Sequence, residues 1–338
     1  MIFGLCDTDD QAPDTQIGTL PTKTLDSGKQ GRYACILYDS TFKVVICNPR
    51  NERLMMDIIE LLIPGKHLSG ITFIEKEKHG LVVTEKSVNF DLLCKEKDTG
   101  EEFLVELQNR FQDSYMDRML AYATYPIRDQ LEERVREAEQ GKKQDKMDYS
   151  LKPIYVVSMV NFSLEHEDER AVEEGYISRY ALRNQWNAEL MTPSLHFVFL
   201  EMGRLNLKPG EEKKCKTLLE KFIFSMKYMH TMTHQPDDFH DPMLDRLYQA
   251  TEMANLTVTE QQKYDKAMYT EIDRIAQNNY ARKEGKAEGL AEGRAEGIAE
   301  GRAEGIAEGE AKERERIIKA LKEAGVPEDV IAKAVAAE

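Results

Sequence analysis

Two acidic residues in the stretch from Ser87 to Gln108 have a spacing that could hold a metal ion. Asp91 alternates with apolar residues in SVNFDLLC and Glu106 does so in FLVELQ, so both segments have the two-residue period of a β-strand. The segment KDTG between them is rich in turn residues, which is typical of a β-hairpin. If the strands pair in the register that joins their apolar faces, Asp91 and Glu106 lie on a common face, close enough to share a cation.

Two carboxylates buried together are costly, because each loses hydration and each repels the other. Mg²⁺ or Mn²⁺ would remove this conflict, since hard divalent ions prefer oxygen ligands. Acids at strand ends, in contact with water or with a basic side chain, would explain the same pattern without a metal. The spacing alone favours that second interpretation, because such alternation is common in strands.

A helix is expected behind this hairpin, between Asp113 and about Gln140, where the period changes from two to about 3.6. Four residues recur at three- and four-residue steps along one side: Tyr115, Arg118, Tyr122 and Tyr125. An arginine inside an aromatic stripe needs an anionic partner. Either the stripe is core packing with Arg118 paired to an acid, or Arg118 and Tyr122 contact the carboxylates or a phosphate.

The remaining elements surround the hairpin. Asn51 is an expected helix N-cap, and an apolar stripe follows it until Pro64 and Gly65 end the helix. Strands are expected at 71–74, 153–160 and 195–200, and the almost continuous apolar run at 153–160 is typical of a strand covered on both faces. The pattern is helical again from Glu211 to about Tyr280.

Composition limits the function. The 338 residues are 41% hydrophobic and 32% charged, with a formal net charge of −15, which argues against binding nucleic acid by bulk electrostatics. Any DNA contact would need local basic residues and metal ions that bridge to phosphate. Five cysteines without a C-x-x-C pair indicate a reducing compartment, and no stretch resembles a signal peptide or a membrane span. We therefore expect a cytoplasmic protein without a membrane partner.

The last segment of the chain is a tetrapeptide repeat in which glycine recurs every fourth residue from Gly285 to Gly309. Each glycine costs a helix about 1 kcal/mol relative to alanine, so the repeat is a marginal helix by itself. The tail is expected to be a self-association or partner-binding element, or a spacer. A zinc site at His230, His234 and His240 is not expected, because no convincing fourth ligand lies nearby.

The order of the elements and four motifs resemble a known family. The motifs are YDSTFK at 38–43, the hairpin segments SVNFDLLCKE and FLVELQNR, RMLAY at 118–122, and LYQATEMANLTVTEQQKYDKAMY followed by the glycine repeat. Helix, three strands, helix and strand in this order resemble the αβββαβ core of PD-(D/E)XK nucleases. The motifs resemble its Rpn group, the recombination-promoting nucleases and putative transposases, over about residues 31–338.

The resemblance implies an α/β (α+β) fold with a restriction-endonuclease-like αβββαβ core, in which helices flank a mixed central sheet. A helical C-terminal region and a long helical tail would follow. The expected domains are a flexible leader at 1–30, a nuclease-like domain at 31–205, a helical region at 206–283, and a helical tail with a terminal helix pair at 284–338.

The resemblance also implies a metal site. Asp91 and Glu106 would bind Mg²⁺ or Mn²⁺, with the main-chain carbonyl of Leu107 as a further ligand. The metal would polarise the scissile phosphate and lower the pKa of a bound water, which gives hydrolysis of DNA phosphodiester bonds.

Gln108 occupies the place of the lysine that is usual in this superfamily. A neutral amide can orient the water but cannot neutralise the developing charge, so Arg118 or Arg110 would have to do so, and Tyr122 completes the expected catalytic set. The chain departs from the group after Phe42-Lys43, where an aromatic residue and a glycine are usual and VVIC stands instead. The resemblance is therefore a weaker guide to the packing of the N-terminal elements than to the carboxylate site.

Two functions follow from these observations. The first is a Mg²⁺-dependent DNA endonuclease of the recombination-promoting type. The second is a catalytically inactive protein with the nuclease fold, whose helical tail mediates homo-oligomer formation or binds a protein. The acidic balance and the glutamine at position 108 favour the second function, whereas the motif set favours the first.

Overall fold

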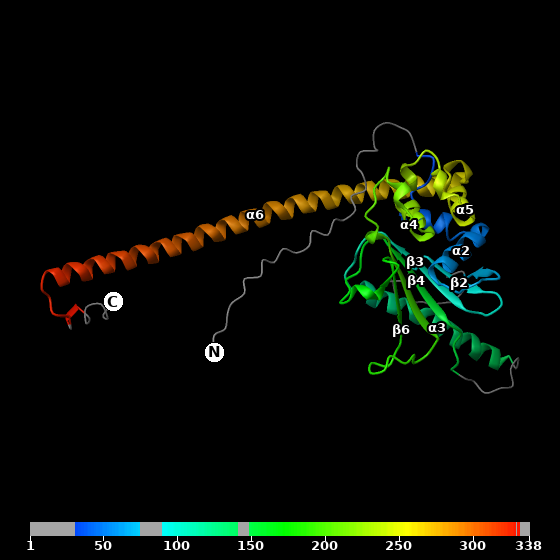
Figure 1. Ribbon diagram of the computed structural model, residues 1–338, viewed down its shortest axis with the longest axis horizontal. Coiled ribbons are helices and arrows are strands. Elements are labelled where there is room, and N and C mark those ends of the chain that lie inside the picture. Colours follow the sequence, from blue (N-terminus) through cyan, green and yellow to red (C-terminus); the bar gives the residue numbers. More distant parts are fainter. Residues whose placement is uncertain (1–30, 75–89, 141–148, 329, 332–338) are drawn as a thin grey trace. The chain divides into compact units, whose positions relative to one another are not determined.

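The computed structural model describes residues 31–74, 90–140, 149–328 and 330–331. The chain divides into two compact units, Met1–Tyr269 and Thr270–Glu338. Within the described residues, seven strands of the first unit form one mixed sheet in the order β1-β2-β3-β4-β7-β6-β5 (Figure 1). The strands are β1 (Ile71–Phe73), β2 (Leu92–Glu96), β3 (Glu102–Gln108), β4 (Ile154–Val160), β5 (Val172–Glu173), β6 (Ile177–Ala181) and β7 (Leu195–Glu201).

The predicted hairpin is formed by β2 and β3, which pair antiparallel with Leu92 opposite Val105. β4 then pairs parallel with β3 and with β7, so the centre of the sheet is parallel. Residues 87–89 of the predicted hairpin lie outside the described residues. Phe90 precedes β2 and packs against the ring of Tyr125, so it lies on the side opposite to Leu92 and not beside it as the alternation predicted. The two-residue period does not extend to residues before the strand begins.

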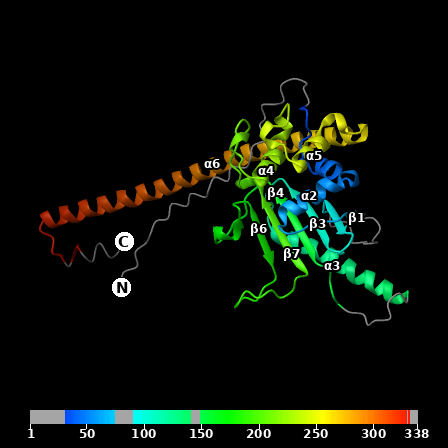
Figure 2. The same cartoon turned by 45° about the vertical axis from the view of Figure 1, so that its right-hand side comes forward.

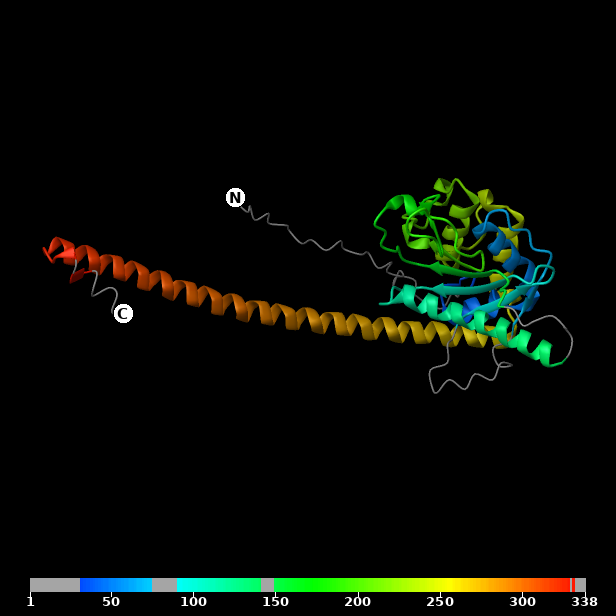
Figure 3. The same ribbon diagram turned by 90° about the horizontal axis from the view of Figure 1, so that it is seen from below.

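Helices cover both faces of the sheet (Figures 2 and 3). α3 packs on one face, where Met119 and Ala123 belong to the same buried cluster as Leu93 and Leu104 of the hairpin. The other helices of the first unit contribute to the larger core on the opposite face. The helices are α1 (Asp39–Val45), α2 (Glu52–Leu62), α3 (Tyr115–Glu139), α4 (Leu218–Tyr228), α5 (Pro242–Thr251) and α6 (Val258–Glu323).

β3 explains why a carboxylate can lie against α3. Its side chains alternate, so Phe103, Val105 and Leu107 enter the larger core, whereas Leu104 lies on the face that α3 covers. Glu106 lies two positions after Leu104, and therefore faces the same helix. The predicted order of helix, three strands, helix and strand is confirmed, and so is the helix between Asp113 and Gln140.

Two strands of the sheet were not expected from the sequence. β6 pairs antiparallel with β7, and β5 pairs antiparallel with β6 at the edge of the sheet. They lie in a charged segment where only Ile177 and Ser178 are buried, so the apolar alternation that predicts a strand is too short to recognise.

α6 begins in the first unit and continues through the glycine repeat of the second. No residue of α6 is buried. Among the described residues, none of the helices combines the length and the apolar character that crossing a membrane requires. The expected leader at 1–30 lies outside the described residues. The expected boundaries at 205 and 283 stay a prediction.

Candidate active site

Asp91 and Glu106 meet at the end of the hairpin. Asp91 directly precedes β2, and the register of the hairpin places it opposite Glu106 of β3. The main-chain N–H of Asp91 donates a hydrogen bond of 3.0 Å to Oε2 of Glu106. The main-chain N–H of Leu107 donates one of 2.7 Å to Oδ2 of Asp91. Each carboxylate is thus held by the main chain beside the other, as the sequence led us to expect.

Both carboxylates are buried. The side chain of Asp91 is 2% exposed and that of Glu106 is 7% exposed. Burial raises the pKa of Asp91 and that of Glu106, and the charge of Asp91 raises the pKa of Glu106 further. Two buried acids that resist ionisation together favour a cation between them.

Lys43 is the nearest cation to Asp91. Its Nζ lies 3.0 Å from Oδ1 of Asp91, and 2.8 and 2.9 Å from the two carboxylate oxygens of Asp39. Burial alone would lower the pKa of Lys43, but Asp91 and Asp39 outweigh it and raise that pKa, so the ammonium is retained. α1 positions this group: Phe42 and Val45 are fully buried, and Asp39 and Lys43 are four residues apart on the helix surface.

Arg118 of α3 approaches from the other side. Its Nη2 donates a hydrogen bond of 2.7 Å to Oε1 of Gln108 and lies 3.8 Å from Oε1 of Glu106. The guanidinium also binds the side-chain oxygen of Gln112 and lies 4.8 Å from the ring centre of Tyr115. The expected anionic partner of Arg118 is therefore Glu106.

Gln108 and Tyr122 lie within this group of side chains. Besides its bond with Arg118, Gln108 donates from Nε2 to the main-chain oxygen of Arg110, at 2.7 Å. The half-buried ring of Tyr122 lies 5.7 Å from the guanidinium of Arg118 and packs against Phe90. The structure thus brings together the side chains of Asp91, Glu106, Gln108, Arg118 and Tyr122, whereas Arg110 meets this group through its main-chain oxygen.

Lys43 and Ser158 received no role from the sequence. Ser158 of β4 lies opposite Glu106 and is hydrogen-bonded to the hydroxyl of Tyr115. A signal for each was present: a serine interrupts the apolar run of β4, and Asp39 and Lys43 flank a buried phenylalanine with helical spacing. Neither signal shows which residue, distant in sequence, the side chain of Lys43 or of Ser158 contacts.

The donor atoms fit a hard divalent cation. Asp91 and Glu106 supply carboxylate oxygens. The N–H of Leu107 points at Asp91, and the N–H and C=O of one strand residue face the same neighbouring strand, so the Leu107 carbonyl lies on that side as well. Oxygen donors with an excess of buried negative charge suit Mg²⁺ or Mn²⁺.

The site differs from a metal cage made of side chains alone. Among the described residues, no group of three or more His, Cys, Asp or Glu side chains is arranged to hold a metal ion. This finding leaves a site built from two carboxylates and a main-chain carbonyl.

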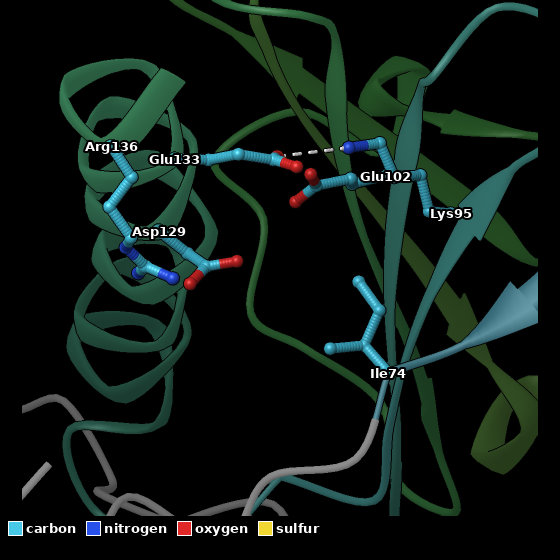
Figure 4. A pocket seen from close by; sticks show the side chains of 6 residues that line it. All are labelled: Ile74, Lys95, Glu102, Asp129, Glu133 and Arg136. Carbon is cyan, nitrogen blue, oxygen red and sulfur yellow. Dashed lines mark hydrogen bonds and ion pairs between the residues drawn. The ribbon is translucent and has the colours of Figure 1, made fainter. Parts of the chain in front are cut away.

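A separate cleft lies between the hairpin and the later turns of α3 (Figure 4). Glu102 of β3, which is only 1% exposed, points into it, and its Oε2 has no hydrogen-bond partner within the described residues. Burial raises the pKa of Glu102 to about 7. The lining residues are Ile74, Lys95, Glu102, Asp129, Glu133 and Arg136, none of which belongs to the Asp91 and Glu106 pair.

Residues 36–281 match the family described as PD-(D/E)XK nuclease family transposase. No curated protein and no solved structure gives a significant match to the chain.

Proposed function

Because the chain belongs to the PD-(D/E)XK nuclease family transposases, we propose that it is an endonuclease that hydrolyses DNA phosphodiester bonds with Mg²⁺ or Mn²⁺. The observation that carries this proposal is the meeting of two buried carboxylates, Asp91 and Glu106, beside the Leu107 peptide. The three carboxylates of Asp39, Asp91 and Glu106 face two cations, Lys43 and Arg118. The site therefore keeps an excess of negative charge, which a divalent ion would balance.

Asp91, Glu106 and the Leu107 carbonyl would hold the metal, which when bound polarises the phosphate and lowers the pKa of a water. The hydrogen bonds to Asp91 and Glu106 fix both carboxylates before the substrate arrives, so little reorganisation is needed. Arg118 places a positive charge beside Glu106. Gln108, held by Arg118, can orient a water through its amide, and the ring of Tyr122 packs beside Arg118 and restricts its position.

Cleavage of supercoiled plasmid tests this function. The wild type is expected to nick or linearise the plasmid with Mg²⁺ or Mn²⁺ and to leave it intact with EDTA. Asp91→Asn and Glu106→Gln keep the size of each side chain but remove a charge, and we expect at least a 100-fold loss of rate, by analogy with the loss of a single charge-stabilising group in an active site. Asp91→Ala should lose activity as well.

Glu102→Gln is the matched control, because Glu102 is a buried glutamate on the same strand and faces the same helix. It should cleave like the wild type. Cleavage by the Asp91 and Glu106 variants at the wild-type rate would refute the proposed site. Lack of cleavage by the folded wild type with either metal would refute the proposed activity.

The long helix favours a second candidate function, self-association. α6 carries a glycine every fourth residue in its repeat, and Leu290, Ile298 and Ile306 are exposed among them. Close packing of two such helices would cover these side chains. The mass in solution of the full chain and of a chain ending at residue 283 would test this, and an equal oligomeric state would speak against it.

The cellular location belongs to the same proposal. Within the described residues, Cys35, Cys47, Cys94 and Cys215 form no disulfide. Thiols outside disulfides fit a reducing compartment, so we propose that the protein is cytoplasmic.

A further inference from the structure

The neutral residue at position 108 leaves the proposed reaction without its usual lysine, and α1 supplies a lysine from another element. Nζ of Lys43 lies 3.0 Å from Oδ1 of Asp91, whereas the side chain of Gln108 is uncharged and binds Arg118 and the Arg110 carbonyl. We propose that Lys43 is the catalytic lysine of this chain, and that its ammonium contacts the scissile phosphate when the DNA lies beside Asp91. This inference rests on the proposed nuclease function.

The contacts of Lys43 suit this role. Its ammonium has three N–H donors. One faces Asp91, which is 2% exposed, while the others face Asp39, which is 68% exposed. Exposed ion pairs contribute only about 0 to 1 kcal/mol, so a phosphate oxygen can replace an Asp39 oxygen at little cost. Lys43 itself is 35% exposed, so a substrate can reach it while it keeps its contact with Asp91.

Arg118 is less suited to the same role. Its guanidinium is bound to Gln108 and to Gln112, and it stacks on Tyr115, so several contacts would have to break before it could turn toward a phosphate. Its Nη2 also lies 3.8 Å from Oε1 of Glu106, which is longer than a hydrogen bond. Arg118 therefore acts on Glu106 and Gln108, as a positioning residue.

In the reaction, the oxygen of a water bonds to phosphorus while the bond to the leaving sugar oxygen breaks. The water gives up one proton to solvent, and the leaving oxygen takes one from solvent. Lys43 exchanges no proton in this scheme. It stabilises the negative charge that builds on the phosphate oxygens, which is the electrostatic role of a preorganised donor.

The first test removes the positive charge of Lys43 and then adds one at position 108. Lys43→Met should reduce plasmid cleavage about 100-fold or more, as for removal of one preorganised donor. Adding Gln108→Lys in the same chain should raise the cleavage rate more than about twofold above that of Lys43→Met. Lys95→Met is the matched control, because Lys95 is also 35% exposed and paired with a carboxylate, and it should cleave like the wild type.

The second test measures DNA binding and does not depend on cleavage. DNA binding is measured by fluorescence anisotropy at several salt concentrations, with Ca²⁺ and separately with EDTA. Loss of one phosphate contact should reduce the slope of log K against log salt by about 0.9 in Lys43→Met and leave it unchanged in Lys95→Met.

The outcomes separate the two proposals. Wild-type cleavage by Lys43→Met, or an unchanged salt slope without rescue by Gln108→Lys, would overturn the role of Lys43 and leave the nuclease function standing. A wild type that binds DNA without cleaving it would refute the nuclease function, while the slope would still decide whether Lys43 contacts phosphate. A wild type that binds no DNA under either condition would refute both.

Discussion

Replacing Glu102 with glutamine should stabilise the folded chain at alkaline pH and leave the proposed activity intact. Glu102 lies on β3 at the cleft shown in Figure 4, is 1% exposed, and has an oxygen without a hydrogen-bond partner among the described residues. Burial raises its pKa to about 7, the charge of Lys95 and a hydrogen bond with Gln130 oppose this rise, and the charges of Asp129 and Glu133 add to it. At pH 8 the folded chain must therefore hold an unfavourable buried charge.

The magnitude follows from the difference between the folded and unfolded states. The ordinary pKa of the group is 4.5 and the folded value is about 7. At about 1.36 kcal/mol per pKa unit, this difference corresponds to about 3 kcal/mol. Because the folded pKa is raised, the stabilising contribution of the neutral carboxyl is complete below about pH 4.5 and is lost as the pH rises through about 7. Glu102→Gln removes this loss. The difference in free energy of unfolding between the variant and the wild type should therefore grow from about pH 4.5 to about pH 7 and stay constant at higher pH.

Urea unfolding at pH 5 and pH 8 measures the effect. We expect Glu102→Gln to raise the free energy of unfolding by up to about 3 kcal/mol at pH 8 and by much less at pH 5. Glu132→Gln is the control, because Glu132 is a half-exposed glutamate on α3 that should change stability by less than about 0.5 kcal/mol. An advantage of Glu102→Gln that is the same at both pH values would refute the reasoning, because it could not come from titration of Glu102.

Two further predictions concern the site itself. Saturating Mn²⁺ should raise the free energy of unfolding of the wild type by about 2.7 kcal/mol at a concentration 100 times the dissociation constant, and should not do so for Asp91→Asn or Glu106→Gln. Equal stabilisation of all three, measured by thermal unfolding, would place the ion elsewhere. Ser158→Ala removes the buried hydrogen-bond partner of Tyr115 and should cost about 1–3 kcal/mol of stability in urea unfolding. The exposed Ser150→Ala should cost less than about 0.5 kcal/mol, and an equal cost for both would contradict the importance of the Tyr115 contact.

The hairpin and α3 could be predicted from sequence because their patterns are local. The alternation around Glu106 spans one strand, and the stripe that contains Arg118 spans three turns of one helix. The contact between Lys43 and Asp91 joins α1 to the start of β2, and no local period reports such a distant pairing. The same holds for Ser158, whose partner Tyr115 belongs to another layer of the fold.

The local charge at the site accounts for how an acidic chain could act on DNA. The chain carries a formal net charge of −15, so attraction over long distances is unfavourable. At the site, the three carboxylates of Asp39, Asp91 and Glu106 face two cations, Lys43 and Arg118. A bound divalent ion would turn this single excess negative charge into a net positive charge, and only then would the site attract a phosphate. Metal binding should therefore precede productive DNA binding, so affinity for DNA should be higher with Ca²⁺ than with EDTA. Removing Asp91 or Glu106 should abolish that difference, because each removes a ligand of the ion on which the attraction depends.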